Sequence, residues 1–490
     1  MPSSVTPPPL LPFRRRGNRR RRRGRLTLAG RLVLGGAILA VPVALFAARA
    51  VWQDDSSLEP STALPPVSAP PPREPLIAEP RLSPPVTRIR FEGARAHAAE
   101  IDPSAVPRLV EWIDDAGQVV PVPGSEQMRA AGAIRVEYSL DEALTDRIFE
   151  ILRRGRVARG HAIVLDPRSG RLLAYVSTDP REFPAERAYP SASIVKVLTA
   201  AAMLEEEDRG TDIDCVYRGN KYRLHYRRLE RPKQGRRATL EEALASSNNQ
   251  CFSQWALHVL GEDRIRETLD RFGWLSSPAP GHEAGMLAPV ESKLDLGRLG
   301  SGLDGIRVTP LHVASLATIL TDGVAVEPWW IDRMLDASDQ SLPLPARAEP
   351  RRVLSRAHAD ALRKMMVATT TRGTARGAFR SRGGRLTLPS IRVAGKTGNL
   401  TGFDPPGRYE WFLALAPAEA PTIAVVVLQL QSNLWWSRST ELAADILKTV
   451  FCESRRCDER YAERFTGDLT EGTRPMLISE LSTEERSISR

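Results

Sequence analysis

Apolar runs of strand length occur at two widely separated places in this chain. The first two runs, 162–165 and 172–176, flank a sequence from Asp166 to Gly170 that is typical of a turn. The long stretch from Ser193 to about Thr370 is mostly helical in pattern. Strands return after it at 391–394, 410–416 and 423–430, and a terminal helix follows at about 440–451. Strands at both ends of a helical block predict an α/β fold in which one sheet carries an inserted helical lobe.

Positive charge is concentrated at the start of the chain. The formal net charge is +10, and the first 31 residues contain ten arginines and no acid. Without them the chain is neutral, with 59 basic and 59 acidic residues. A nucleic-acid-binding domain is expected to carry its basic surplus on the folded part. Nucleic acid is therefore not an expected partner.

The arginine-rich leader, residues 1–31, precedes an apolar stretch that we interpret as a membrane anchor at 32–52. Positive charge on its N-terminal side predicts a single pass with that side in the cytoplasm. The alternative is a cleaved signal peptide, because Ala48-Arg49-Ala50 resembles a cleavage site. Both readings export the bulk of the chain, to a periplasmic or extracellular location at the cytoplasmic membrane.

The exported part divides by composition. Prolines at 53–86 indicate a stiff linker, and 87–134 reads as a small membrane-proximal segment with a helix through 106–113. The main domain is expected at 135–452, starting with a helix over 140–153 that Ser139 caps. The remainder, 453–490, is charged and aperiodic, which predicts a disordered tail.

Four cysteines would lie in an oxidising compartment after export. Cys452 and Cys457 are close enough in sequence to pair locally, which leaves Cys215 with Cys251, but four cysteines allow three connectivities. The seven histidines are scattered without metal-binding spacing, so neither a metal nor another cofactor is expected.

Lysine is rare, with seven lysines against 62 arginines. A desolvated lysine can lose its proton near neutral pH, whereas arginine cannot. Ser193 and Lys196 have the i, i+3 spacing that places both on one face of a helix's first turn. A lysine with a lowered pKa in that position could activate the serine as a nucleophile.

Two further polar motifs follow in order. Ser247 and Asn249 lie where one apolar helix gives way to another, and Ser246 with Asn248 is the alternative register. Lys396-Thr397-Gly398 follows the apolar run 391–394, and a cation, a hydroxyl and backbone N–H groups together can bind a carboxylate. Each motif is weak alone, but the ordered set is specific.

With these three motifs the chain resembles the penicillin-binding protein transpeptidases, over about 135–451. The segments 164–174, 305–314 and 373–375 extend the resemblance. Only ~80 residues separate anchor and main domain, too few for a glycosyltransferase domain. The resemblance is therefore to the monofunctional, class B-like members. It implies a mainly antiparallel sheet sandwiched by helices, with the active site where the sheet meets the helical lobe.

The resemblance also implies roles. Ser193 is the expected nucleophile, Lys196 its base, and Ser247 a proton relay to the leaving group. The substrate would be held by Asn249, Lys396, Thr397, Gly398 and Asn399, with the N–H groups of Ser193 and Asn399 as the oxyanion hole. Asn399 stands where many of these enzymes have threonine, and this leaves the acyl acceptor open.

The implied function is a serine D,D-transpeptidase that cross-links peptidoglycan stem peptides and is acylated by β-lactams. The alternatives are a D,D-carboxypeptidase or endopeptidase, a β-lactamase or β-lactam sensor, and a non-catalytic cell-wall scaffold. Expected partners are stem peptides, their lipid-linked precursor, β-lactams and other cell-wall synthesis proteins.

Overall fold

The structure is a computed structural model, and it describes residues 87–88, 98–101, 111–113, 119–121, 134–206, 213–279, 281–335, 338–342, 344, 347–431, 436–454 and 456–466. All of them belong to one compact unit that spans Pro75–Arg490. The basic leader and the predicted anchor at 32–52 lie outside the described residues. Within the ranges given above, no helix combines the length and apolar character needed to cross a membrane.

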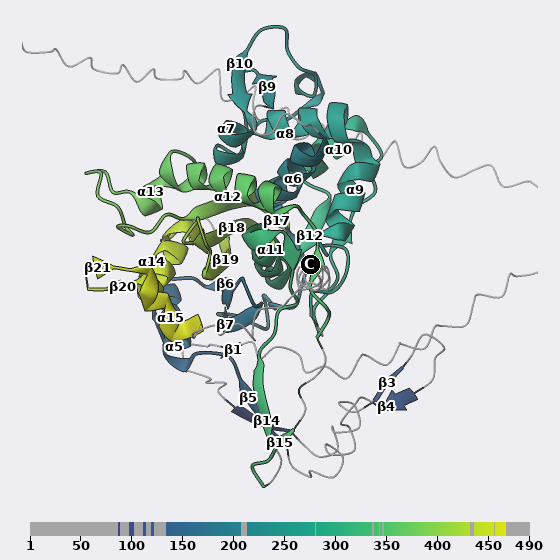
Figure 1. Cartoon of the computed structure of the whole chain (residues 1–490). Coiled ribbons are helices and arrows are strands. Elements are labelled where there is room, and N and C mark those ends of the chain that lie inside the picture. Colours follow the sequence, from purple (N-terminus) through teal and green to yellow (C-terminus); the bar gives the residue numbers. More distant parts are fainter. Residues whose placement is uncertain are drawn as a thin grey trace, which may run out of the picture. The chain divides into compact units, whose positions relative to one another are not determined.

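Six of the described strands form the central sheet (Figure 1). Their order is β1-β7-β6-β19-β18-β17, and each neighbouring pair is antiparallel except β1 with β7. The long strands are β6 (Arg159–Asp166), β7 (Arg171–Ser177), β17 (Ala394–Phe403), β18 (Pro406–Ala416) and β19 (Ile423–Gln431). Strand β6 pairs with β19, which confirms that the two ends of the domain build one sheet. Strand β17 lies at its edge.

Both faces of the sheet are buried. Along β6, Ile163 and Leu165 belong to one apolar core, and Ala162 and Val164 belong to another on the opposite face. Because neither face meets water, the strands read as nearly continuous apolar runs instead of alternating ones. The first core includes α6 (Lys196–Glu206), α11 (Pro310–Asp322) and α12 (Arg356–Thr371), and the second includes α5 (Glu142–Arg154) and α14 (Ser439–Phe451).

The inserted lobe follows α6 in sequence and returns to the sheet through α11 and α12 (Figure 1). Its helices are α7 (Leu240–Ala245), α8 (Asn249–Trp255), the π-helical η5 (Ala256–Leu260), α9 (Gly261–Arg271) and α10 (Lys293–Ser301). Its short strands are β9 (Asp214–Tyr217), β10 (Arg236–Thr239), β11 (Met286–Leu287) and β12 (Ile306–Val308), and β12 pairs with β8 (Tyr189–Pro190), which precedes α6. The prediction of a sheet with an inserted helical lobe is confirmed.

The segment 87–134 contributes strands to the central sheet and to two smaller sheets. Strand β1 (Thr87–Arg88) pairs with β7, and β2 (Ala98–Ile101) pairs with β5 (Ile134–Tyr138), which in turn pairs with β14 (Ile331–Leu335). The predicted helix over 106–113 is wrong at its end. Residues Glu111–Ile113 form β3, paired with β4 (Val119–Pro121), and the preceding residues are not described.

Helix α5 has a different cap from the predicted one. The Asp141 carboxylate accepts a hydrogen bond from the backbone N–H of Leu144 at 2.6 Å. The Ser139 hydroxyl instead donates to the Leu172 carbonyl oxygen at 2.6 Å. The helix therefore begins at Glu142, and Ser139 ties the preceding chain to β7.

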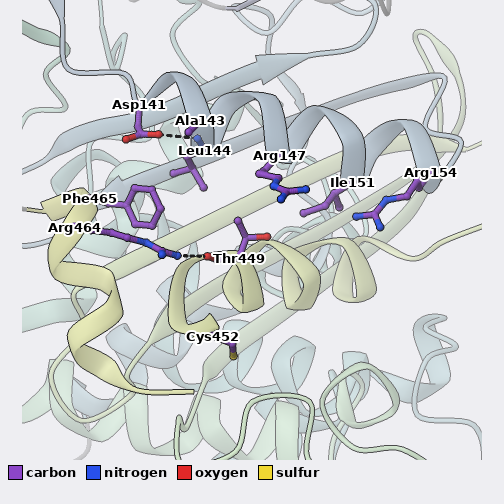
Figure 2. Close-up of a pocket in the computed structure, with 10 residues that line it drawn as sticks. All are labelled: Asp141, Ala143, Leu144, Arg147, Ile151, Arg154, Thr449, Cys452, Arg464 and Phe465. Atoms are coloured by element: carbon purple, nitrogen blue, oxygen red, sulfur yellow. Dashed lines mark hydrogen bonds between the residues drawn. The ribbon is translucent and has the colours of Figure 1, made fainter. Parts of the chain in front are cut away.

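The expected disordered tail is wrong for residues 453–454 and 456–466. The disulfide Cys452–Cys457 closes a two-stranded turn, β20 (Cys452–Glu453) with β21 (Arg456–Cys457), and η6 (Glu459–Ala462) and α15 (Glu463–Thr466) follow. Figure 2 shows Arg464 donating to the Thr449 carbonyl oxygen, at 2.6 Å, and Phe465 beside the start of α5. Arg464 and Phe465 are among the residues that line a pocket of about 600 Å³ between α5, α14 and α15. Buried Ala462 and Thr466 explain why the segment folds onto the domain. Residues 467–490 lie outside the described part.

Candidate active site

The three sequence motifs meet between the edge of the sheet and the helical lobe. Ser193 lies on the short 3₁₀ turn η2 (Ala192–Ile194), directly before α6, which begins with Lys196. Ser247 and Asn249 come from the α7–α8 junction, and Lys396 comes from β17. Hydrogen bonds join Lys196 to Ser193 and Asn249, and Lys396 to Ser247.

The turn that carries Ser193 is held by a close backbone contact. Ala192 adopts a positive φ of 47°, which is costly for a residue with a Cβ. A Cβ added to Gly302 would lie 2.0 Å from the Ala192 carbonyl oxygen, so only glycine fits there. Gly302 ends α10 with a left-handed φ of 67°. The C-terminus of α10 and the turn that carries Ser193 are therefore packed backbone to backbone.

Lys196 is fully buried and has three polar neighbours. Its Nζ lies 2.6 Å from Ser193 Oγ, 2.7 Å from Asn249 Oδ1 and 2.6 Å from the Ser301 carbonyl oxygen. Burial, followed by the positive charge of Lys396, lowers the pKa of Lys196 well below its usual value. A neutral amine has two N–H groups for the two carbonyl-type acceptors. Its lone pair is then left facing the serine hydroxyl.

The α7–α8 junction turns Ser247 toward Lys396. Ser247 has a positive φ of 53°. The Asn248 side chain caps α8 by accepting from the N–H groups of Gln250 and Cys251, and the Ser246 hydroxyl donates to the Glu242 carbonyl oxygen. The register with Ser247 and Asn249 is therefore the one in which both residues face the motif lysines.

Asn249 is fixed from two sides. Its Oδ1 accepts from Lys196, while its Nδ2 donates to the Tyr222 carbonyl oxygen at 2.8 Å. The adjacent Lys221 carbonyl accepts from the Asn249 backbone N–H at 3.1 Å. The loop that carries residues 218–222 thus sets the orientation of the Asn249 amide.

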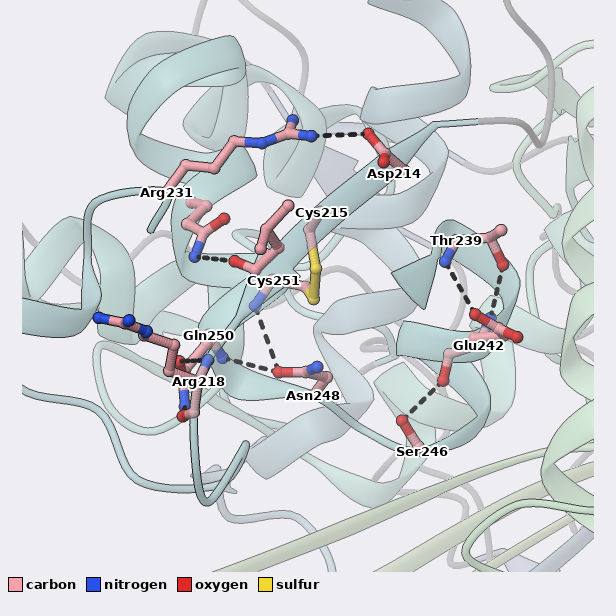
Figure 3. The surroundings of a disulfide bond; sticks show 12 residues. Asp214, Cys215, Arg218, Arg231, Thr239, Glu242, Ser246, Asn248, Gln250 and Cys251 are labelled. Carbon is pink, nitrogen blue, oxygen red and sulfur yellow. Dashed lines mark hydrogen bonds and ion pairs between the residues drawn. A yellow bond between two sulfur atoms is a disulfide. The ribbon is translucent and has the colours of Figure 1, made fainter. Parts of the chain in front are cut away.

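The same loop is tied to α8 by further bonds. Figure 3 shows the Cys215–Cys251 disulfide and, beside it, Gln250 reaching Arg218. Gln250 Nε2 donates to the carbonyl oxygens of Arg218 and Asn220, at 2.9 and 2.8 Å. Both disulfides considered from the sequence, Cys215–Cys251 and Cys452–Cys457, are the pairs formed in the structure.

Lys396 is the second fully buried lysine. Its Nζ donates to Ser247 Oγ at 3.2 Å and to the Thr397 carbonyl oxygen at 2.7 Å. Burial lowers the pKa of Lys396 to about 7. The half-buried Thr397 hydroxyl lies 2.7 Å from that of Thr374, which comes from the connection between α12 and α13 (Arg376–Phe379). Two hydroxyls and a lysine thus lie along the edge strand.

The last two predicted residues differ in their surroundings. Gly398 faces η2, where an added Cβ would lie 3.2 Å from both Ala192 Cβ and Ile194 Cγ1. The strand and the turn that carries Ser193 can approach closely because this position has no side chain. The exposed Asn399 side chain, by contrast, accepts at 2.6 Å from Nε of Arg408, a residue of the neighbouring strand β18. Among the described residues, no hydrogen bond joins the Asn399 side chain to the motif lysines or serines.

Sequence reasoning missed two contributors. Ser301 acts through its backbone carbonyl, which no side-chain pattern reveals, although Gly302 after an apolar helix was a signal for a helix end. Thr374 lies in the segment 373–375 that carries part of the family resemblance, but its pairing with Thr397 required the fold.

Known proteins that are similar to this chain belong to one family. The family model for the penicillin-binding protein transpeptidase domain matches residues 160–451. The peptidoglycan D,D-transpeptidase PbpA of Mycolicibacterium smegmatis is 27% identical over 312 residues, covering 55% of this chain and 61% of that protein. The chain thus spans less than two thirds of the length of that curated relative.

Two solved structures show the fold. The D,D-transpeptidase domain of a peptidoglycan glycosyltransferase from Eggerthella lenta is 20% identical, with a TM-score of 0.55, covering 75% of this chain and 98% of that one. The penicillin G acyl-enzyme complex of penicillin-binding protein A from M. tuberculosis is 24% identical, with a TM-score of 0.51, covering 64% of this chain and 79% of that one. From residue 160 to residue 451, and with its three motifs joined in one buried site, this chain belongs to the penicillin-binding protein transpeptidase family.

Proposed function

We propose that this protein is a serine D,D-transpeptidase that cross-links peptidoglycan stem peptides through an acyl-Ser193 intermediate. The observation that carries the proposal is the environment of Lys196, a buried lysine 2.6 Å from Ser193 Oγ with two further acceptors for its protons. A side chain with this burial and these partners suits a general base.

The first step forms an ester. Ser193 Oγ attacks the carbonyl carbon of the penultimate D-Ala while its proton passes to Lys196 Nζ. The N–H groups of Ser193 and Asn399 stabilise the negative oxygen, at a typical worth of about 3 kcal/mol per donor. The C–N bond to the terminal D-Ala then breaks, and its nitrogen takes a proton relayed by Ser247, which Lys396 contacts.

The substrate is held on both sides of the scissile bond. The Thr397 and Thr374 hydroxyls and the Lys396 charge bind the terminal carboxylate. The side-chain amide of Asn249 hydrogen-bonds the peptide amide of the substrate, in addition to its bonds with Lys196 and Tyr222. An amine from a neighbouring stem peptide then attacks the ester, which forms the cross-link and releases Ser193.

A β-lactam follows the first step only. Its ring carbonyl takes the place of the D-Ala carbonyl, and the broken amide remains attached, so no small leaving group departs. The named acyl-enzyme complex of the M. tuberculosis relative with penicillin G supports this part of the proposal.

The chain is anchored, in this proposal, by residues 32–52, with its catalytic domain outside the cytoplasmic membrane. The arginine-rich leader and the apolar run support the orientation. Alkaline carbonate extraction of membranes from cells that express the full chain tests it. Release of the full-length protein into the soluble fraction would contradict the anchor.

A fluorescent penicillin tests the nucleophile. The full chain should retain a covalent label after denaturation, and Ser193→Ala should retain none. Ser246→Ala is the matched control, because that neighbouring hydroxyl donates to a helix carbonyl and should leave labelling intact. A stable label on Ser193→Ala would overturn the assignment.

Mass spectrometry of a defined stem pentapeptide distinguishes the reaction types. Cross-linked dimer is the expected product when an acceptor stem is present. Hydrolysed tetrapeptide alone would identify a carboxypeptidase instead, and unchanged pentapeptide together with a lack of penicillin label would contradict enzymatic activity.

A further inference from the structure

A strongly basic part of the helical lobe lies beside the catalytic motifs. We call residues 214–239 the basic lobe, because nine arginines and lysines stand there against Asp214 and Glu230, a net charge of 9 − 2 = +7. Outside the leader and the basic lobe, the chain has 50 basic and 57 acidic residues and is therefore net acidic. The basic lobe comprises β9, the 3₁₀ turn η4 (Tyr226–Arg228) and β10.

Most of this charge has no acidic partner. Asp214 pairs with Arg231 and Arg237, at 3.1 and 3.0 Å, and Glu230 lies 3.3 Å from His258. Within the described ranges, no acid forms an ion pair with the other seven cations, which are Arg218, Lys221, Arg223, Arg227, Arg228, Lys233 and Arg236. Unpaired positive charges this close together create a positive electrostatic potential, which attracts polyanions.

Exposed aromatic rings lie among these cations. Tyr222 is 48% exposed and Tyr226 is 62% exposed, although large apolar side chains elsewhere in the lobe, such as Leu229, are buried. Lys221 Nζ lies 5.3 Å from the centre of the Tyr222 ring. Sugar rings pack their C–H faces on aromatic rings, while arginine pairs with carboxylates. Rings and cations together suit a glycan that carries carboxylates.

The basic lobe is fixed to the catalytic site. The Cys215–Cys251 disulfide and the Gln254 Nε2 bond to the Val216 carbonyl oxygen, at 3.0 Å, hold β9 against α8. Tyr222 accepts from Asn249 through its carbonyl oxygen, at 2.8 Å. A polymer bound along the lobe would therefore lie next to the residues that process its peptides.

We infer that the basic lobe is a binding surface for the uncross-linked glycan strand, which it holds through the carboxylates of the stem peptides and through stacking of sugars on Tyr222 and Tyr226. This inference rests on the proposed function, because it takes the strand to be the substrate. The lobe would keep the strand attached between successive cross-linking events, outside the cleft that binds the terminal D-Ala residues.

Binding of the full chain to soluble glycan strands tests the inference. The probes are strands with pentapeptide stems, the same strands stripped of peptide, and polyphosphate of similar length. The triple variant Arg223→Gln, Arg227→Gln, Lys233→Gln should bind stem-bearing strands at least roughly tenfold more weakly at low salt, with a smaller salt dependence. Tyr226→Ala should weaken binding of the stem-bearing and the stripped strands.

The matched control is Lys364→Gln, Arg382→Gln, Arg385→Gln, which removes the same three charges from exposed positions outside the lobe. It should bind strands as the unchanged protein does. Both triples should be labelled by a fluorescent penicillin at the unchanged rate, which shows that they fold and that the cleft works.

The outcomes separate the two proposals. If both triple variants lose the same affinity for stem-bearing strands, or if the lobe variant loses none, the proposed binding surface is wrong. Either result would leave penicillin acylation, and with it the proposed function, intact. Polyphosphate binding as tight as that of stem-bearing strands would also overturn it, because the surface would then select charge alone. Absence of penicillin labelling in the unchanged protein would instead refute the proposed function.

Discussion

Lys196 Nζ lies 2.6 Å from the backbone carbonyl oxygen of Ser301, 105 residues further along the chain. That carbonyl belongs to the last residue of α10, where the partial negative charge of the helix is greatest. Together with Asn249 Oδ1 it occupies the two protons of a neutral amine. The position of Lys196 Nζ is therefore set by three elements that are distant in sequence.

Lys196→Arg should abolish acylation while preserving positive charge. A guanidinium stays protonated and cannot accept the serine proton, so the second-order rate constant for a fluorescent penicillin should fall by about 10³-fold. Lys293→Arg, at an exposed position on α10, is the control and should leave the rate unchanged. An acylation rate within tenfold of the unchanged protein would exclude Lys196 as the base.

Lys396 should influence the pH profile through Lys196. The charge of Lys396 adds to burial in lowering the pKa of Lys196. Removing that charge in Lys396→Met should therefore raise the pKa of Lys196 and move the acid limb of the acylation profile to higher pH. The measurement is the rate of penicillin acylation from pH 5 to 9 in both proteins. A shift toward lower pH, or none, would contradict the coupling.

Gly302→Ala should misplace the nucleophile. Its new Cβ would lie 2.0 Å from the Ala192 carbonyl oxygen, so the turn carrying Ser193 must move. Acylation should fall by on the order of 100-fold. Gly273→Ala is the control, because Gly273 also has a positive φ, of 75°, but an added Cβ would meet nothing within 4 Å. Both variants carry the same backbone strain, so similar acylation rates would refute the proposed packing.

Much of this fold follows from sequence because the relevant signals are local. The apolar runs of β6, β7, β18 and β19 are long, and the ordered motifs identify which residues of η2, α6, α8 and β17 enter the site. The fold of the segment after Cys452 was harder to predict from sequence, because its few apolar residues become buried only when the segment docks on α14.

The site was predictable as a set of residues but less so as a network. The Asn249 amide is oriented by a carbonyl of residue 222, and Lys196 by a carbonyl of residue 301. Backbone acceptors carry no residue signature, so only the fold places them. Asn399 illustrates the converse: its motif position is clear, but the cross-strand neighbour Arg408 turns its side chain toward β18.

The two disulfides should differ in their effects. Cys215 and Cys251 are 36 residues apart, and Cys452 and Cys457 only five. Loop-closure entropy predicts a loss of about 4 kcal/mol in the free energy of unfolding for the Cys215→Ala, Cys251→Ala pair and about 2 kcal/mol for the other pair. Only the Cys215→Ala, Cys251→Ala double substitution should also slow acylation. Cys251 lies two residues after Asn249, so loss of this disulfide should disturb the position of Asn249. Urea denaturation and penicillin labelling measure both effects. Equal stability losses, or unchanged acylation in the first pair, would contradict this.

His161→Phe should stabilise the protein in acid. His161 is buried, stacks on Phe183 with ring centres 4.7 Å apart, and has no hydrogen-bond partner for either ring nitrogen among the described residues. Burial lowers its pKa to about 3. Between that value and the unfolded pKa of about 6.5, the unfolded chain binds a proton that the folded chain does not. Stability is therefore lost as pH falls below about 6.5, by roughly 1.4 kcal/mol per unit.

At pH 5 the free energy of unfolding of His161→Phe, relative to the unchanged protein, should be about 2 kcal/mol more favourable than the same difference at pH 8. Thermal or urea unfolding at both pH values measures it. His312→Phe gives the contrast, since the pKa of His312 is also lowered, to about 4, but its ring bonds to Thr309 and Ser276. That variant should lose stability at pH 8 because those bonds are broken. A His161→Phe gain that is the same at pH 5 and pH 8 would show that packing, and not protonation, is responsible.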